Sequence, residues 1–126
     1  MYESVALISP QSTYAVDVLE REFRRRLAGF QVVRSGSRFK LSDGMWELSM
    51  TMNGDPAVLE ASKEIADRYG EGRPDRDTIA SCARRLEIRG GADPQMLHCN
   101  DYIVALECLE VFKGIFLFNA RGHQWI

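Results

Sequence analysis

The stretch FQVVRSGSRFKLSDGMWELSMTM, residues 30–52, decides the fold of this 126-residue chain. Apolar and polar residues alternate at Phe39 and Leu41, and again from residue 46 to residue 52. Alternation with a period of two places one set of side chains on a core and the other in solvent. Ser-Gly and Asp-Gly pairs between the segments are typical of tight turns. The stretch therefore predicts a three-stranded antiparallel meander.

One strand and one helix are predicted before the meander. Residues 5–8 form a short apolar run, which indicates a strand. Apolar residues then recur at intervals of three and four from residue 16 to residue 27, the spacing of one helical face. We expect this helix to begin near Ser12 or Thr13, either of which can cap it, and to end at Gly29.

Two helices are predicted directly after the meander. Asp55 and Pro56 are typical of a helix start, and Gly70 ends that helix. Asp75 or Asp77 is expected to cap the next helix. The apolar face of this next helix is formed by Ile79, Cys82, Ala83 and Leu86.

A fourth helix and a last strand complete the prediction. Helical spacing links Ile103, Leu106, Leu109 and Phe112, and Gly114 ends the helix. The apolar residues 115–118 indicate a buried strand, and residues 123–126 extend it or pair at its edge. We expect one α+β domain over residues 1–126, in the order strand, helix, three strands, three helices, strand. Its mainly antiparallel sheet has four to five strands, with helices packed on one face.

Composition is that of a folded cytoplasmic protein. Hydrophobic residues make up 45% of the chain, and the net charge is -2. An acidic balance argues against a nucleic-acid partner. The start of the chain lacks a signal-peptide pattern, and no apolar run is long enough to span a membrane. Three cysteines without a CxxC pair and two distant histidines predict no disulfide framework, metal or cofactor.

His98 and Asp101 are the main candidates for chemistry. A histidine and a carboxylate three residues apart lie on one helical turn, where the carboxylate can orient a general base. Cys99 is the only nucleophile nearby, but adjacent helical residues diverge. Together with Arg85, this pair defines an alternative hypothesis, a small enzyme or nucleotide-binding domain. The other interpretation is a helix start in which Asn100 or Asp101 is the cap.

A polar segment from residue 73 to residue 102 is the main candidate for recognition. It is rich in Arg, Asp, Asn and Tyr, and Arg and Tyr are enriched in binding hot spots. The alternative is that its carboxylates cap a helix while its arginines are solvated. The candidate partner-binding residues are Asp75, Arg76, Asp77, Arg84, Arg85, Asp93, Asp101 and Tyr102.

Two strings in the second half carry a resemblance. They are YGEGRPDRDTIASCARRLEIRGGADPQMLHCNDYIVALECLE, residues 69–110, and GIFLFNARGHQWI, residues 114–126. They look like a group of small uncharacterised bacterial proteins. In size and style that group is similar to immunity proteins of type VI and polymorphic toxin systems. The resemblance implies a cytoplasmic protein whose partner is a cognate toxin.

The main hypothesis is therefore a non-catalytic protein-binding module, an immunity protein that neutralises a toxin. Residues 55–126 carry twelve acidic and nine basic residues, and an acidic surface speeds association with a basic partner. A monomer and a homodimer that pairs through a strand edge are both consistent with the pattern.

Overall fold

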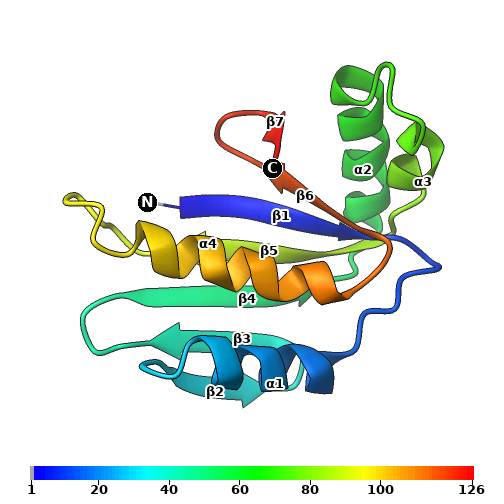
Figure 1. Ribbon diagram of the computed structural model, residues 1–126. Coiled ribbons are helices and arrows are strands. Elements are labelled where there is room, and N and C mark those ends of the chain that lie inside the picture. The colour runs from blue at the N-terminus through cyan, green and yellow to red at the C-terminus, as the bar shows by residue number, and fades with distance from the viewer. Residues whose placement is uncertain (1) are drawn as a thin grey trace.

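The computed structural model describes residues 2–126, which form one antiparallel sheet with helices on both faces (Figure 1). The strand order across the sheet is β2-β3-β4-β5-β1-β6-β7. The strands are β1 (Tyr2–Ile8), β2 (Gln31–Ser35), β3 (Arg38–Ser42), β4 (Glu47–Asn53), β5 (Arg84–Gly90), β6 (Ile115–Asn119) and β7 (Gln124–Trp125). The helices are α1 (Val16–Arg26), α2 (Pro56–Tyr69), α3 (Arg76–Ala80), α4 (Cys99–Glu107) and the short 3-10 helix η1 (Cys108–Val111).

The predicted meander is confirmed as β2, β3 and β4. Phe39 lies opposite Met50, and Leu41 lies opposite Leu48, so the four apolar side chains share one face of the sheet. All four are at most 1% exposed. The period-two pattern therefore fixed both the strands and their register, because a slip of one residue would turn these side chains to solvent.

Strand β1 lies inside the sheet, between β5 and β6. Its alternate residues belong to two separate cores. Ala6 and Ile8 pack in the larger core, and Val5 and Leu7 pack in the smaller one. A strand buried on both faces is apolar throughout rather than alternating, which explains the apolar run that predicted it.

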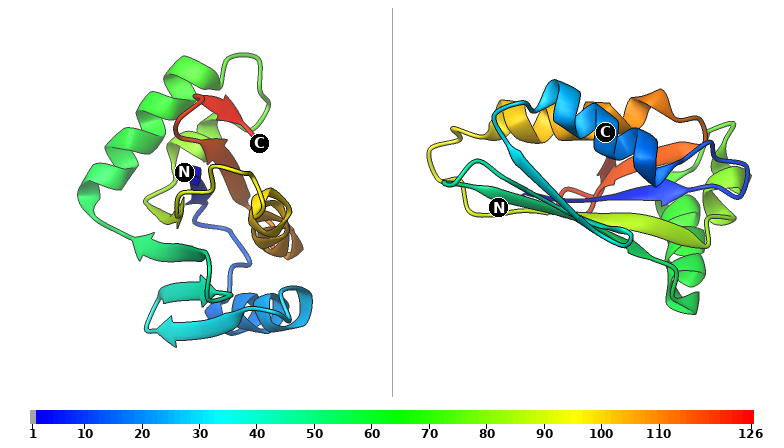
Figure 2. Two further views of the ribbon diagram at one scale, coloured as in Figure 1. Left: turned by 90° about the vertical axis from the view of Figure 1, so that its left-hand side faces the viewer. Right: turned by 90° about the horizontal axis from the view of Figure 1, so that it is seen from below.

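Helices cover both faces of the sheet, so the prediction of helices on one face is wrong. Helix α1 contributes Leu19 and Phe23 to the larger core, and α4 contributes Leu106. Helices α2 and α3 contribute Ala66 and Ile79 to the smaller core. Figure 2 (left) shows α2 on one side of the sheet and α1 and α4 on the other.

The predicted third helix is also wrong in its second half. Helix α3 ends at Ala80, and the chain continues as β5, which pairs with both β1 and β4. Leu86 and Ile88 are fully buried and alternate with the half-buried Arg85 and Glu87. This is a strand pattern, but Leu86 also fits the helical spacing from Ile79. Because this segment pairs with β1 on one side and β4 on the other, it is a strand. Together, β5 and β7 raise the strand count above the predicted four to five, to seven.

Helix α1 begins later than predicted, at Val16, and no side chain caps it. Ser12 and Thr13 instead tie the preceding loop to the chain before β6. The Ser12 hydroxyl donates to the Lys113 carbonyl at 2.8 Å, and the Lys113 N–H donates to the Thr13 hydroxyl at 2.8 Å. The two hydroxyls therefore join the loop after β1 to the segment before β6.

The start of α2 is confirmed. Asp55 accepts a hydrogen bond from the Ala57 N–H at 2.9 Å, and Pro56 is in the first turn.

Cys82 and Cys108 are buried free thiols, and burial raises the pKa of each to about 11. Of the helices within residues 2–126, none has the length and apolar character needed to cross a membrane.

Candidate functional site

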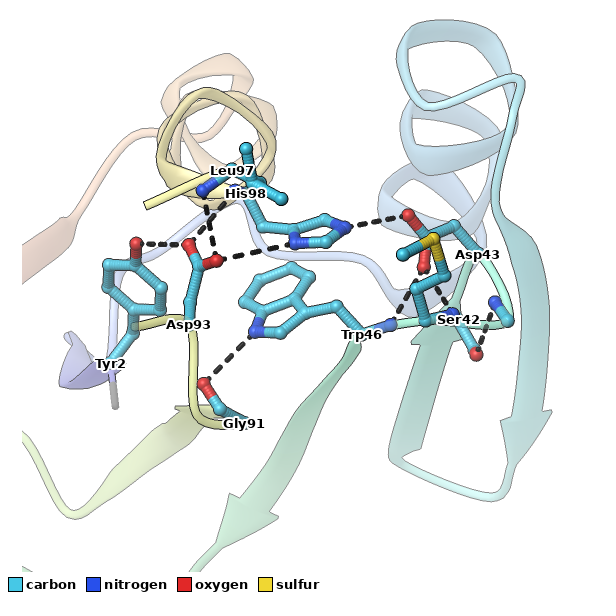
Figure 3. Close-up of polar contacts among 10 residues, drawn as sticks. Tyr2, Ser42, Asp43, Trp46, Gly91, Asp93, Leu97 and His98 are labelled. Atoms are coloured by element: carbon cyan, nitrogen blue, oxygen red, sulfur yellow. Dashed lines mark hydrogen bonds and ion pairs between the residues drawn. The ribbon is translucent and has the colours of Figure 1, made fainter. Parts of the chain in front are cut away.

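Two loops lie side by side at one end of the sheet: residues 43–46 between β3 and β4, and residues 91–98 between β5 and α4 (Figure 3). They meet because β4 and β5 are neighbours. The Gly91 N–H donates to the Glu47 carbonyl at 2.9 Å, and the Trp46 indole N–H donates to the Gly91 carbonyl at 3.0 Å. The buried Trp46 ring thus joins the two loops.

Asp93 organises the second loop. Its carboxylate accepts the N–H of Leu97 at 3.0 Å, the N–H of His98 at 2.9 Å and the Tyr2 hydroxyl at 2.7 Å (Figure 3). Burial favours a raised pKa, but the hydrogen bonds from Tyr2 and His98 outweigh it and lower the pKa of Asp93. The same bond to the carboxylate is the largest cause that raises the pKa of Tyr2 to about 12. Asp93 is therefore a charged residue that shapes the loop from inside.

His98, in the second loop, contacts one carboxylate of each loop through its two ring nitrogens. Nε2 lies 2.8 Å from an oxygen of Asp43, and Nδ1 lies 3.5 Å from an oxygen of Asp93 (Figure 3). The ring stacks on Trp46 with centroids 5.0 Å apart and planes at 15°. The bond to Asp43 is the largest cause that raises the pKa of His98. An imidazolium here donates toward a carboxylate on each loop and holds the loops together.

Asp43 is held in its charged form as well. Its carboxylate accepts the N–H of Met45 at 2.9 Å and the N–H of Trp46 at 2.8 Å. The bond from Met45, followed by those from Trp46 and His98, lowers the pKa of Asp43 against the opposing effect of burial. Both carboxylates that face His98 are thus bound to backbone N–H groups, which fixes their positions.

The loops expose apolar side chains. Met45 is 83% exposed, Leu97 is 66% exposed and Met96 is 65% exposed, the three highest values for a large hydrophobic residue in the described chain. Met45 and Leu97 line the same shallow hollow of about 150 Å³ beside Trp46 and His98. Met96 has a φ of 55°, a conformation that is uncommon for a residue other than glycine. We call Met45, Met96 and Leu97 the loop surface.

A second candidate region is the side of the sheet opposite α1 and α4, which we call the open face. Along β2 to β5 the side chains of this face are exposed or half-buried. They include Val33, Lys40, Ser49, Thr51, Glu87 and Arg89. Neighbours across the strands follow the register, in which Ser49 lies opposite Arg89 and Arg89 lies opposite Glu3.

A hollow of about 280 Å³ lies where the open face meets α2, and we call it the α2 hollow. Val5, Ile65 and Phe118 form apolar parts of its lining. Its charged lining residues are Glu3, Glu64, Arg68, Arg85, Glu87 and Arg89. Arg85 pairs with Glu87 at 2.9 Å, and Arg68 pairs with Glu64 at 3.1 Å.

The eight predicted partner-binding residues lie in separate places. Asp75, Arg76 and Asp77 are at the start of α3. The Asp75 carboxylate pairs with Arg73 at 2.9 Å. The Arg76 guanidinium donates to the Ala66 carbonyl at 2.9 Å, at the end of α2. Two of these three therefore have structural contacts, and Asp77 is exposed.

The other predicted residues divide between β5 and α4. The Arg84 guanidinium lies 5.8 Å from the ring centre of Tyr14, and Arg85 lines the α2 hollow. Asp101 is in the first turn of α4. The Tyr102 hydroxyl lies 2.6 Å from the Ser4 hydroxyl. Of the eight residues, only Asp93 belongs to the two loops.

The alternative enzyme residues are not brought together. The carboxylates that contact His98 are Asp43 and Asp93 rather than Asp101. Arg85 points into the α2 hollow, on the opposite side of the sheet from the core in which Trp46 and α4 pack. Cys99 begins α4 and is half-buried.

Sequence reasoning missed Asp43, Trp46 and Tyr2 as partners of the second loop. Asp43 is 55 residues from His98 in sequence, and Tyr2 is 91 residues from Asp93. The only local signal was the Asp43-Gly44 turn, which predicts a hairpin but does not indicate which other segment lies beside that hairpin. Across the described residues, no group of three His, Cys, Asp or Glu side chains is arranged to hold a metal ion.

Comparison with protein-family models, with curated proteins and with solved structures finds no match to this chain. The geometry of the loop surface and of the α2 hollow is therefore the basis for the function.

Proposed function

We propose that this protein is a non-catalytic protein-binding module, an immunity protein that binds and neutralises a cognate bacterial toxin through the loop surface. The observation that carries the proposal is that the three most exposed large hydrophobic residues of the described chain, Met45, Met96 and Leu97, lie on two adjoining loops, where Met45 and Leu97 line one hollow. Exposed apolar side chains that cluster in this way mark interaction sites. Methionine side chains also adapt to irregular partner surfaces.

The loops beneath these side chains are held in position before a partner binds. Trp46 packs in the larger core, and His98 connects Asp43 to Asp93 across the two loops. Loops fixed in this way lose little conformational freedom on association, which favours tight binding. The positive φ of Met96 fits this interpretation, because strained backbone clusters at functional sites.

The arrangement of His98 favours binding over catalysis. A general base needs a ring nitrogen within reach of the proton that it removes. Both ring nitrogens of His98 face carboxylates, and one face of the ring is stacked on Trp46. The histidine therefore supports the loops that present the loop surface.

The first experiment asks whether a toxin partner exists. The tagged protein is purified from cells that also express the products of its neighbouring genes, and bound proteins are identified by mass spectrometry. We expect one stoichiometric partner that survives moderate salt. Expression of that partner alone should arrest growth, and co-expression of this protein should restore growth. A neighbour that is not toxic, or a toxic neighbour that this protein does not neutralise, contradicts the immunity function.

Two matched variants test the surface. Leu97→Asp places a charge at a residue that is 66% exposed on the loop surface, and Val111→Asp does so at a residue that is 50% exposed on η1. We expect Leu97→Asp to abolish growth rescue and Val111→Asp to retain it. Circular dichroism and a urea titration establish that both variants are folded. Equal rescue by both variants excludes the loop surface as the binding site.

A further inference from the structure

The α2 hollow carries a second inference, which goes beyond the proposed function and uses none of the loop surface. Two opposite charges in its lining form no side-chain hydrogen bond or ion pair with another described residue: Arg89, which is exposed and is only attracted by the charge of Glu87, and Glu3, which is half-buried. They are direct neighbours across β5 and β1. Cβ atoms of such neighbours lie about 4.5–5.5 Å apart. The hollow thus presents one cation and one anion side by side, and neither side chain is held in a hydrogen bond or ion pair within the described residues.

The remaining charges of the hollow are already paired. Glu87 lies 2.9 Å from Arg85 and also accepts a hydrogen bond from Asn53 at 3.3 Å. Burial favours a raised pKa for Glu87, but these two bonds, together with the positive charges of Arg85 and Arg89, outweigh it and lower that pKa. Arg68 pairs with Glu64 along α2. A ligand that enters the hollow therefore meets Arg89 and Glu3 as the charged groups whose side chains form no hydrogen bond or ion pair with another described residue.

The α2 hollow also has an apolar part, and its volume is small. Val5 is 7% exposed and Phe118 is 3% exposed, and Ile65 faces them from α2. The volume of about 280 Å³ is just below the range of roughly 300–1,000 Å³ that holds drug-sized ligands. The space suits a molecule with one apolar side chain and few other atoms.

We propose that the α2 hollow binds an apolar α-amino acid in its zwitterionic form. The carboxylate of the amino acid pairs with the Arg89 guanidinium, whose planar fork matches a carboxylate with two hydrogen bonds. The ammonium group pairs with Glu3. An α-amino acid carries both charges on one carbon atom, which matches the spacing of neighbouring residues across two strands. Its side chain packs on Val5, Ile65 and Phe118.

Isothermal titration calorimetry tests this site with three probes. L-phenylalanine carries both charges, phenylalaninamide lacks the carboxylate, and N-acetyl-phenylalanine lacks the ammonium group. We expect saturable binding of L-phenylalanine. Each blocked probe should bind at least about tenfold more weakly than L-phenylalanine, since one charged hydrogen-bond partner is lost in each. Phenylalaninamide also stands for the N-terminus of a peptide, and N-acetyl-phenylalanine for a C-terminus. Equal binding of one blocked probe would falsify the free amino acid as the ligand.

Variants assign each charge. Arg89→Gln should weaken binding of L-phenylalanine about tenfold and leave phenylalaninamide unchanged, and Glu3→Gln should leave N-acetyl-phenylalanine unchanged. Lys40→Gln is the control, because Lys40 is a cation on the same open face that pairs with Glu47 outside the hollow. Absence of binding by the wild-type protein, for L-phenylalanine and L-leucine alike, overturns the proposal. This outcome does not bear on the proposed binding of a toxin by the loop surface.

Discussion

The loop surface and the α2 hollow differ in how their charged groups are paired. Beneath the loop surface, Asp43, His98 and Asp93 contact one another or backbone N–H groups, and the exposed side chains are apolar. The α2 hollow has apolar lining residues, and beside them Arg89 and Glu3 form no side-chain hydrogen bond or ion pair with another described residue. In the first region the charges order the loops, whereas in the second Arg89 and Glu3 are the charges that we propose to bind a ligand.

The contrast follows from the two faces of the sheet. Helices α1 and α4 cover one face, so polar groups near its end must find partners inside the protein. The other face is covered by α2 and α3 at one side, and its polar residues along β2 to β5 remain in contact with solvent. Substitutions should therefore have different consequences in the two regions.

The largest expected effect is that of Trp46→Ala. Trp46 is 5% exposed, stacks on His98 and donates to Gly91. Loss of such a side chain lowers the free energy of unfolding by about 3–5 kcal/mol, which a urea titration measures. The control is Val33→Ala on the exposed part of β2, with an expected change within about 0.5 kcal/mol. Similar values for both variants contradict the role of Trp46 in joining the loops.

A smaller effect is expected for Gly90→Ala in β5. A Cβ atom at residue 90 lies 2.6 Å from the Trp46 ring and 3.1 Å from the Tyr2 ring. Overpacking of this kind costs about 1–3 kcal/mol. Gly54→Ala is the matched control, because its Cβ meets nothing within 4 Å. If the clash is with Trp46, the cost of Gly90→Ala should shrink when Trp46→Ala is also present.

A pH dependence specific to His98 comes next. The carboxylate of Asp43 raises the pKa of folded His98 above its ordinary value of about 6.5. The stabilisation is therefore complete below about pH 6.5 and is lost as pH rises through the folded pKa. As the pH rises above about 6.5, we expect the Tm of the wild type to fall more steeply than the Tm of His98→Asn. Parallel curves contradict the ion pairs between the loops.

The smallest effect is expected in the α2 hollow. Arg89→Gln removes an exposed charge that forms no side-chain hydrogen bond or ion pair with another described residue, so the free energy of unfolding should change by about 0.5 kcal/mol or less. A urea titration checks this value beside the calorimetry described above. A loss near that of Gly90→Ala shows that Arg89 has a structural role, and the contrast between the two regions then fails.

The strands with clear alternation could be predicted from sequence, and the contacts between distant segments could not. Phe39, Leu41 and Met50 identify the meander because their burial follows a period of two. Leu86 was assigned to a helix because it fits two periods, and only pairing with β1 and β4 distinguishes them. Asp93 was named as a binding residue, but its role in shaping a loop depends on Tyr2, which is distant in sequence.

Both proposed sites depend on contacts between segments that are distant in sequence. The loop surface exists because β4 and β5 are adjacent, which places residues 43–46 beside residues 91–98. Arg89 and Glu3 lie opposite each other because β1 and β5 are adjacent. Neither juxtaposition leaves a pattern within one segment of the sequence.

The most direct test of the proposed function is amide hydrogen exchange of this protein, free and in complex with the toxic neighbour that it neutralises. The account predicts slower exchange in the complex at residues 43–46 and 91–98, with little change along β2 and β3 on the open face. Protection of the open face or of the α2 hollow, with the two loops unchanged, contradicts the loop surface as the site that binds the toxin.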